Sequence, residues 1–318
     1  MSPVPIVTLQ NGVKMPMVGL GTWQSRDEDV RKAIEVALID EKYPLIDTAA
    51  VYDNEDIIGE VVTKLIGEKK LKREDVFITT KLWTTHLNPS RSEDGIKECL
   101  KRLNMDKVDL LLAHMPTAFD INMSSQEKEI TVEDVWKGLE AIYDKGLARA
   151  IGVSNWNAEQ IERVMKVAKV PIHNVQVELY VYFPQHELYE VCKKHGISLT
   201  SYASMGSPGR VNFQLPTGQK LDWAPAPSAL EDEKVVELSK KYSKSPAQIL
   251  LRYCLDRDIC VIPKSVTPSR IHENIQLFDF KLDKEEVAAL NSLKHTQRLF
   301  LQDFMVGHPE DAFKNERK

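Results

Sequence analysis

The chain has 318 residues, of which 42% are hydrophobic and 28% are charged, and its formal net charge at pH 7 is -5. This composition argues against disorder and supports one large apolar core. The negative net charge argues against a nucleic-acid partner, because proteins that bind phosphate backbones cluster Lys and Arg. Length alone leaves the domain count open, since α/β barrels longer than about 250 residues still fold as single units.

The start of the chain, MSPVPIVTL, has neither a basic leader nor a long apolar segment, and no uncharged apolar run reaches the length of a membrane span. We therefore expect a cytoplasmic protein without a membrane partner. The four cysteines, Cys99, Cys192, Cys254 and Cys260, form no C-x-x-C pair and have no His at metal-ligand spacing. We expect reduced structural thiols and no metal site.

From the amino terminus onward, the segment IVTLQNGVKMP contains an Asn11-Gly12 pair, which predicts a two-stranded hairpin. Eight short apolar or β-branched runs follow, and their continuous hydrophobicity is typical of strands buried on both faces. These runs end near Leu20, Asp47, Lys81, His114, Ser154, Glu178, Tyr202 and Ile262.

Amphipathic segments lie between these runs, and capping residues mark where helices begin and end. Four helix starts are predicted, by Ser25 with Glu28, Asn88 with Pro89, Asn157 with Gln160, and Ser245 with Pro246. Gly146 predicts the end of the helix that carries Val135, Leu139 and Ile142. Strand and helix therefore alternate along the chain.

Such alternation indicates parallel strands joined by right-handed crossovers, in an open sheet or in a closed barrel. An open dinucleotide-binding sheet would show G-x-G-x-x-G after its first strand, and the chain has no such motif. Eight repeats favour a (β/α)8 TIM barrel, formed as a single domain by residues 1–318. We expect the hairpin to cap the barrel bottom, and the long segments 115–131, 206–228 and 295–318 to lie over the C-terminal face.

Three ionisable residues end successive predicted strands: Lys81 follows Asp47 by 34 residues, and His114 follows Lys81 by 33. Active sites of barrels lie at the C-terminal ends of the strands, so these side chains should converge there. Tyr52 lies five residues after Asp47, close enough to join them. Each residue alone is more typical of a structural role, such as a turn, a solvated strand end or a core histidine. Together, at this spacing, they indicate a catalytic site.

A tyrosine has an unperturbed pKa of about 10, so a tyrosine that donates a proton at neutral pH needs a cation that stabilises its phenolate. We expect Lys81 to lower the pKa of Tyr52 by roughly two units, which corresponds to about 2.7 kcal/mol. Asp47 would hold Lys81 charged and in place. A neutral His114 would hydrogen-bond the substrate oxygen and orient it.

Seven segments carry a resemblance to a known family, in that family's order: GLGTWQ, LIDTAAVYDNEDIIGE, TTKLW, LLLAHMP, GVSNWN, QVE and IPKSVTPSRIHEN. They are similar to the aldo-keto reductases of the aldose and aldehyde reductase type over nearly the whole chain. The resemblance implies NADPH-dependent reduction of aldehydes and ketones to alcohols. It also implies that Tyr52 is the general acid, that Lys81 and Asp47 tune it, and that His114 positions the carbonyl.

The resemblance further implies a set of residues that bind NADPH or NADP+. By this resemblance Gly21, Thr22 and Trp23 border the cofactor, and Ser154, Asn155 and Gln176 hydrogen-bond its carboxamide. Tyr202 would stack on the nicotinamide ring, a place that a buried core tyrosine would fill equally well. Ser207 and Val266 complete the set around the cofactor, and Glu273 and Asn274 would reach the adenine.

The segment from Pro263 to Asn274 also suggests a phosphate site on chemical grounds. Lys264, Ser265 and Arg270 surround a helix start at Thr267-Pro268. Free backbone N–H groups and the helix dipole favour an anion at such a start. Two added cations suit a 2′-phosphate, and arginine can bind it with two hydrogen bonds. NADPH is therefore preferred to NADH.

Several positions depart from the family pattern. Gln24 replaces a lysine of many relatives, and Gly209 replaces an aspartate that helps to hold the pyrophosphate under a loop. We therefore expect a weak strap and faster release of NADPH than in relatives with that ion pair. Ala203 replaces a serine, Tyr180 replaces a histidine, and Met115 replaces a tryptophan, so the substrate pocket should be less aromatic beside His114.

The substrate pocket is expected to be apolar with few polar anchors. Its candidate lining residues are Trp23, Trp83, Met115, Phe119, Trp223, Leu301 and Phe304, although aromatic residues are equally common in cores and under lids. Sugars, lipid aldehydes, ketosteroids and prostanoids all remain open as substrates. A monomer is expected.

Two other functions remain open. A Schiff-base aldolase would use the same barrel face, with Lys81 or Lys264 as nucleophile. A protein that binds NADPH without turnover would also keep the fold, because fold does not determine function. The intact set of four residues argues against this second alternative.

Overall fold

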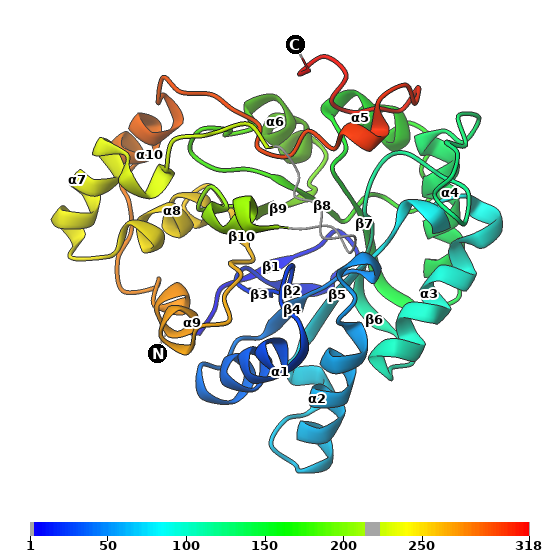
Figure 1. Cartoon of the computed structure of the whole chain (residues 1–318), viewed down its shortest axis with the longest axis horizontal. Coiled ribbons are helices and arrows are strands. Elements are labelled where there is room, and N and C mark those ends of the chain that lie inside the picture. Colours follow the sequence, from blue (N-terminus) through cyan, green and yellow to red (C-terminus); the bar gives the residue numbers. More distant parts are fainter. Residues whose placement is uncertain (1–2, 214–222, 318) are drawn as a thin grey trace.

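Eight parallel strands form the centre of the computed structural model, which describes residues 3–213 and 223–317 (Figure 1). In sheet order they are β3 (Leu20–Gly21), β4 (Leu45–Asp47), β5 (Phe77–Leu82), β6 (Val108–Ala113), β7 (Ala148–Ser154), β8 (Asn174–Glu178), β9 (Ser198–Tyr202) and β10 (Ile259–Val261). Parallel bridges also join Val18 to Val261 and Gly21 to Lys264, which closes the sheet into a barrel. The eight predicted strands and the (β/α)8 fold are confirmed.

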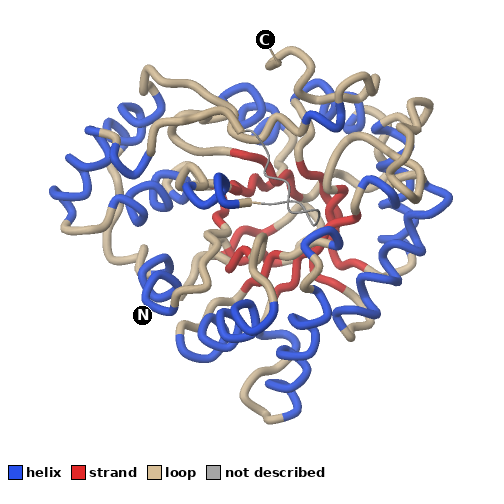
Figure 2. The backbone as a smooth tube through the Cα atoms, viewed as in Figure 1, coloured by secondary structure: helices blue, strands red, loops and turns tan. Residues whose placement is uncertain are grey.

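Helices surround the strands, as the backbone tube in Figure 2 shows. They are α1 (Asp27–Glu35), α2 (Glu55–Gly67), α3 (Pro89–Leu103), α4 (Val132–Asp144), α5 (Ala158–Met165), α6 (His186–Lys194), α7 (Glu233–Tyr242), α8 (Pro246–Leu255), α9 (Pro268–Ile275) and α10 (Lys284–Asn291). A π-helical turn, Val36–Asp40, continues α1, and 3-10 turns lie at Ala50–Tyr52, Arg73–Asp75, Thr84–His86, Pro208–Asn212, Ala229–Glu231 and Asp303–Met305. No helix of the described ranges is long and apolar enough to cross a membrane.

Most predicted helix caps are confirmed. Asn88, Asn157 and Ser245 each accept a backbone N–H at the start of α3, α5 and α8. Gly146, with a φ of +71°, follows the end of α4.

The prediction that Ser25 and Glu28 form a capping box at a helix start is wrong. The residue before α1 is Arg26, and the buried Ser25 hydroxyl has no hydrogen-bond partner within the described residues. The Asn54 amide donates to the carbonyl oxygens of Thr22 and Ser25, at 3.0 and 2.9 Å. The loop before α1 is thereby tied to the barrel mouth, which takes Ser25 away from the helix start.

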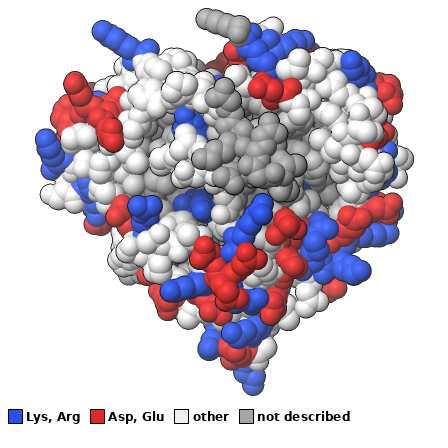
Figure 3. Space-filling model, in the orientation of Figure 1, with Lys and Arg blue, Asp and Glu red and all other residues white. Residues whose placement is uncertain are grey.

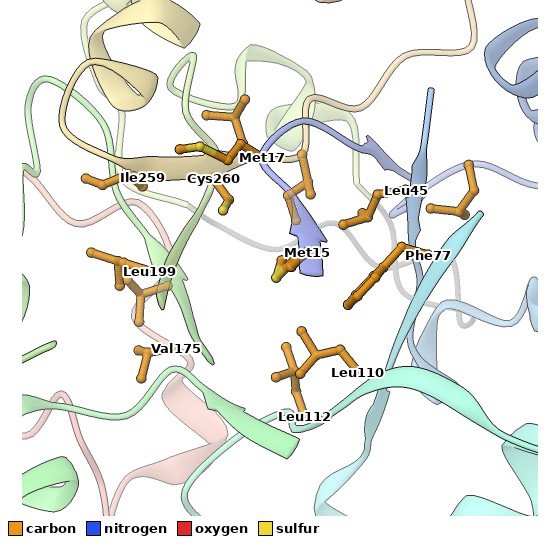
Figure 4. Packing of buried hydrophobic residues seen from close by; sticks show 14 of the residues in the cluster. Met15, Met17, Leu45, Phe77, Leu110, Leu112, Val175, Leu199, Ile259 and Cys260 are labelled. Carbon is orange, nitrogen blue, oxygen red and sulfur yellow. The ribbon is translucent and has the colours of Figure 1, made fainter. Parts of the chain in front are cut away.

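The amino-terminal hairpin is confirmed as the cap at the opposite end of the barrel. Strands β1 (Ile6–Thr8) and β2 (Lys14–Pro16) pair antiparallel, and the turn between them contains Gly12 with a φ of +83°. Met15 is 1% exposed. Figure 4 shows its side chain inside the barrel among Leu45, Phe77, Leu110, Val175 and Leu199.

The carboxyl ends of the strands form the mouth of the barrel, and the chain's tail folds over it as expected. The backbone N–H of Gln297 donates to the Tyr182 carbonyl at 2.9 Å, and the Gln126 side chain donates to the Phe304 carbonyl at 3.1 Å. Segment 115–131 thus contacts the tail. Of the loop 206–228, residues 214–222 lie outside the described part.

In Figure 3 charged side chains of both signs intermingle over the lower part of the molecule, where α1 and α2 lie in Figure 1.

Candidate active site

Asp47, Tyr52 and Lys81 meet at the barrel mouth as the sequence predicted. Asp47 ends β4, Lys81 is the penultimate residue of β5, and Tyr52 ends the 3-10 turn after β4. The Lys81 ammonium donates to Asp47 Oδ1 at 2.5 Å and to the Thr48 carbonyl at 2.8 Å. It also donates to the Tyr52 hydroxyl at 3.4 Å. Lys81 is fully buried, so its charge acts on Tyr52 with little screening by water.

His114, which directly follows β6, completes the group. Its ring lies edge-on to the ring of Tyr52, with centroids 5.6 Å apart, and is 7% exposed. The Asn155 amide donates to the His114 carbonyl at 2.9 Å, which holds the backbone in place. Burial and the charge of Lys81 lower the pKa of His114 well below its usual range. The imidazole is therefore neutral at physiological pH and carries one N–H donor.

The direction of the Tyr52 pKa differs from our expectation. Burial raises this pKa well above 10, and the negative charge of Asp47 raises it further. The lowering expected from Lys81 does not set the direction of this pKa, because the surrounding chain removes water from the phenolate. Tyr52 is consequently protonated at neutral pH and has a proton to donate.

The residues expected around the nicotinamide lie beside these four. The Gln176 amide donates to Asp47 Oδ2 at 2.7 Å, and the Tyr202 hydroxyl donates to Asn155 Oδ1 at 2.6 Å. The Asn155 amide also donates to the Ser154 hydroxyl at 3.2 Å. These contacts link the ends of β7, β8 and β9 to the catalytic group. The four residues expected to contact the carboxamide and the nicotinamide ring therefore lie in one region.

The first loop of the barrel closes around the same region. The Thr22 hydroxyl donates to the Asp47 carbonyl at 2.9 Å. A Cβ added to Gly21 would lie 2.5 Å from the Ile262 carbonyl oxygen, so a side chain is excluded there. Gly21 thus allows β3 to lie against the chain that follows β10, next to the expected phosphate site.

The start of α9 has the features of an anion site. Thr267 is the N-cap residue, but its side chain makes no capping hydrogen bond, and the Ser265 hydroxyl accepts the Thr267 N–H at 3.1 Å. Lys264 and Arg270 are exposed and form no salt bridge with any residue that the structure describes. Burial of its stem lowers the pKa of Lys264, and the charge of Asp29 opposes this shift. Two cations are thus available to a phosphate.

The remaining cofactor candidates of this segment, Glu273, Asn274 and Val266, are more enclosed than Lys264 and Arg270. The Glu273 carboxylate accepts from the Ser245 hydroxyl at 2.6 Å, so α8 orients it. Asn274 is 4% exposed, and Val266 is partly exposed next to the phosphate site.

Gln24 and Gly209 lie in loops at the mouth. Gln24 has a left-handed φ of 60°, and its amide nitrogen is buried without a hydrogen-bond partner in the described ranges. Gly209 belongs to the 3-10 turn Pro208–Asn212, and a Cβ added there would meet nothing within 4 Å. Ser207 and Ala203 have left-handed φ values of 44° and 54°, so both lie at sharp turns of this loop. Gln24 and Gly209 carry no charge, so these two residues cannot form the ion pair that holds the pyrophosphate under a loop in relatives with a strap.

One side of the mouth is an aromatic cluster. The Trp23 ring lies 6.1 Å from Trp223, 5.4 Å from Phe213 and 5.6 Å from Phe300, measured between centroids. Phe300 also contacts Tyr202, with centroids 5.8 Å apart. Sequence reasoning found Trp23 and Trp223 but missed Phe213 and Phe300, because no motif or spacing distinguishes these two from the other residues of the long loops.

The other side contains Trp83, Phe119 and Phe304. Trp83 lies edge-on to His114 with centroids 5.2 Å apart, and Phe304 lies 5.6 Å from Trp83 and 6.0 Å from Phe119. Trp83 therefore lies against His114, and Phe304 and Phe119 continue this row of rings away from it.

Two further pocket candidates contact the tail. Met115 is 2% exposed and packs with Met305, Ala312 and Phe313. Leu301 is partly exposed, and its carbonyl accepts a hydrogen bond from Arg317. Met115 thus packs against the tail and helps to hold it over the barrel mouth.

With this geometry in place, comparison with known proteins identifies the family. Residues 17–295 match the model of the Aldo/keto reductase family. The chain belongs to this family. The resemblance seen in the sequence motifs is therefore confirmed.

Similar proteins share both the sequence and the fold. The chain is 40% identical to aldo-keto reductase family 1 member A1 of Gallus gallus, over 96% of this chain and 97% of that protein. The Homo sapiens protein of the same name is 39% identical, over 96% and 95%. A crystal structure of a Bombyx mori aldo-keto reductase in complex with NADP is 35% identical, has a TM-score of 0.87, and is matched over 98% of this chain and 100% of that one. The aldose reductase of Schistosoma japonicum, also 35% identical, has a TM-score of 0.86 over 98% and 100%.

Proposed function

We propose that this aldo-keto reductase reduces aldehydes and ketones to alcohols with NADPH. The contact of the Lys81 ammonium with both Asp47 and the Tyr52 hydroxyl carries the proposal. In further support, the rings of Tyr52 and His114 lie beside each other. Burial favours a protonated Tyr52 and a neutral His114, and aromatic side chains line the same barrel mouth. This arrangement suits a carbonyl group that must be held and then protonated.

The residues of the mouth fit NADPH. Gly21 lets the first loop lie close to the chain after β10, and Lys264 and Arg270, which form no salt bridge within the described ranges, would bind a 2′-phosphate at the start of α9. Ser154, Asn155 and Gln176 would hold the carboxamide, and Tyr202 would lie against the nicotinamide ring. When bound there, NADPH supplies the hydride that the carbonyl carbon accepts.

The side chains of this chain perform the proton transfer. His114 donates a hydrogen bond to the carbonyl oxygen and aims it at the Tyr52 hydroxyl. Tyr52 gives its proton to that oxygen, and the Lys81 ammonium stabilises the phenolate left behind. Asp47 keeps Lys81 charged and fixed, while Gln176 and Thr22 fix Asp47. The product is an alcohol.

A screen of NADPH consumption over aldehydes and ketones tests the proposal. General acid catalysis contributes roughly 10² to 10⁴ in rate, so Tyr52→Phe should lower kcat by about that factor with at least one substrate. Tyr143→Phe is the matched control, because the Tyr143 hydroxyl contacts Asn11 at the opposite end of the barrel. Full activity of Tyr52→Phe would refute the assignment, and weaker consumption with NADPH than with NADH would refute the cofactor preference.

The same assay separates the other functions of this barrel face. A Schiff-base aldolase would leave substrate bound to lysine after treatment with borohydride, without consuming NADPH. Burial lowers the pKa of Lys81, but its ion pair with Asp47 opposes this shift. Lys81 is a poor candidate for that role, because its side chain is fully enclosed and already paired with Asp47. Binding of NADPH without turnover of any carbonyl compound would indicate a non-enzymatic protein.

We also propose that the chain acts as a single domain over residues 1–318 and as a cytoplasmic monomer. In support of the single domain, the strands that carry the proposed site belong to one eight-stranded sheet. Light scattering after size-exclusion chromatography measures the oligomeric state, and cell fractionation tests the compartment.

A further inference from the structure

Glu178 is a buried carboxylate that the proposed reaction does not use. It ends β8, at the same barrel face as Asp47, and its exposure is 0%. Oε1 accepts the backbone N–H of Leu299 at 2.6 Å, and Oε2 accepts the backbone N–H of Phe300 at 2.9 Å. Both oxygens of a strand residue are thus bonded to the tail, 121 and 122 residues further along the chain.

These bonds lie at one end of a short, well-held crossing of the tail. The Tyr180 hydroxyl donates to the Gln297 carbonyl at 3.0 Å. The Arg298 guanidinium lies over the rings of Phe183 and Phe313, at 4.4 and 3.7 Å from their centroids. Of these contacts, the one to Glu178 Oε2 is made by the backbone of Phe300 itself.

The Phe300 ring connects this crossing to the proposed substrate site. It is 7% exposed and lies 5.8 Å from Tyr202, 5.6 Å from Trp23 and 5.0 Å from Trp223, between centroids. Tyr202 in turn donates to Asn155, whose amide holds the His114 carbonyl. A shift of the tail at Phe300 would therefore move one wall of the mouth.

We propose that Glu178 is a positioning residue for substrate binding, which holds the Phe300 ring as a wall of the substrate site through the backbone of Leu299 and Phe300. The inference rests on the proposed function, since it concerns carbonyl compounds bound at the mouth. Glu178 thereby sets the affinity for substrates that are large enough to reach Phe300. Small aldehydes that reach only Tyr52 and His114 do not depend on it.

The chemistry of the contact explains why the carboxylate is needed. Burial raises the pKa of Glu178 to about 7, while the charge of Arg298 and the N–H groups of Leu299 and Phe300 oppose this shift, so the charged carboxylate predominates above pH 7. Each oxygen of this charged form accepts one buried N–H, and a hydrogen bond to a charged acceptor is about twice as strong as a neutral one. In Glu178→Gln the side chain keeps its volume, but its amide group places an N–H against one of the two backbone N–H groups. A buried donor without an acceptor favours local opening of the segment that carries it.

Hydrogen exchange of the Leu299 and Phe300 amides tests the contact directly. In Glu178→Gln both should exchange about tenfold faster than in the wild type, as expected for the loss of a buried charge-assisted hydrogen bond. Glu140→Gln is the matched control, because buried Glu140 accepts the N–H groups of Lys169 and Val170 at 2.7 and 2.9 Å, on the outer layer of the barrel. Unchanged exchange at Leu299 and Phe300 in Glu178→Gln would overturn the proposal.

Steady-state kinetics test the role in binding. For a bulky aromatic aldehyde, Glu178→Gln should raise KM about tenfold with kcat nearly unchanged, the pattern of lost uniform binding. For a three-carbon aldehyde both constants should stay within about twofold, as they should for both aldehydes in Glu140→Gln. Equal changes with the two aldehydes would contradict a role through Phe300.

A double variant separates this role from a general loss of packing in the tail. Phe300→Ala should raise KM for the aromatic aldehyde, and adding Glu178→Gln should change it little further, because the two residues act in sequence. Fully additive effects would overturn the proposal. If Glu178→Gln fails to fold, Glu178→Asp keeps the charge on a shorter stem and should show the same pattern in weaker form.

Failure of this inference is distinguishable from failure of the proposed function. The exchange measurement needs no turnover, so it tests the contact even if no carbonyl compound is reduced. Turnover by the wild type together with unchanged exchange in Glu178→Gln would leave the proposed function intact and refute only the role of Glu178.

Discussion

At the scale of single residues, the mouth depends on buried polar groups that satisfy one another. Lys81 and Asp47 are 0% and 1% exposed, and each has further partners in Thr48 and Gln176. Breaking a buried ion pair by removing one partner typically costs about 3 to 5 kcal/mol. Substitutions at Asp47 or Lys81 therefore change both stability and chemistry, whereas Tyr52→Phe removes a single hydroxyl and isolates the chemical role.

A buried histidine at the other end of the barrel makes stability depend on pH. The Nδ1 atom of His173 accepts the Ile151 N–H at 3.1 Å, and burial lowers the pKa of this histidine to about 4. In the unfolded chain its pKa is about 6.5. Because the folded state binds the proton less well, His173 contributes stability that is fully present above pH 6.5 and is lost as the pH falls through 4.

The prediction concerns urea denaturation of His173→Asn between pH 7 and pH 4. The variant keeps an acceptor for Ile151 but has no titrating group, so it should lose up to about 3 kcal/mol less stability over this window than the wild type. His186→Asn, at an exposed position, is the control. Identical losses in His173→Asn and in the wild type would contradict a lowered pKa of His173 in the folded state.

At the scale of elements, the strands present residues to the mouth while the connecting loops set how tightly ligands are held. The loop that carries Gln24 and the turn that carries Gly209 lack the charged pair expected of a strap, and Gly209 has free space where a side chain would lie. The start of α9, with Lys264 and Arg270, is the site that we propose for the phosphate instead. We therefore expect cofactor affinity to rest on Lys264 and Arg270 more than on loop closure.

The corresponding prediction concerns release of NADPH. Gln24→Lys with Gly209→Asp should slow release about tenfold, because it adds a charge-assisted contact between the two loops. Stopped-flow fluorescence measures the rate, and each single variant, which adds one charge without its partner, is the control. A wild-type rate as slow as that of a strapped relative would contradict the absence of a strap.

At the scale of the whole molecule, the barrel separates stability from chemistry along its axis. The hairpin and its Met15 side chain fill the amino-terminal end (Figure 4), while the site and its loops lie at the carboxyl ends of the strands. Barrels commonly divide their two faces in this way. Changes at the hairpin should therefore affect unfolding without affecting turnover.

Met15→Ala tests this separation. Removing a buried methionine costs about 2 to 5 kcal/mol, and kcat should stay unchanged because Met15 is far from the mouth. Met123→Ala is the control for stability, because Met123 is 37% exposed. Urea denaturation and NADPH consumption measure the two quantities. A large fall in kcat for folded Met15→Ala would show that the two ends are coupled.

Much of the fold follows from local patterns in the sequence. The strands, most caps and the hairpin are marked by hydrophobic periodicity, N-cap residues and an Asn-Gly turn, all of which act between near neighbours. The convergence of Asp47, Lys81 and His114 also follows, since parallel strands of one barrel end at one face. Ser25 misled this reasoning because the distant Asn54 side chain holds its backbone.

The sequence by itself therefore determined the barrel, the family and the four residues at its mouth, because these depend on short-range spacing and on topology. Only the tertiary structure decided how that mouth is built. Burial sets the direction of the Tyr52 pKa, and contacts across 122 residues bring the Phe300 backbone to Glu178. No local pattern specifies such contacts, because they depend on where loops and tail come to rest once the barrel has closed.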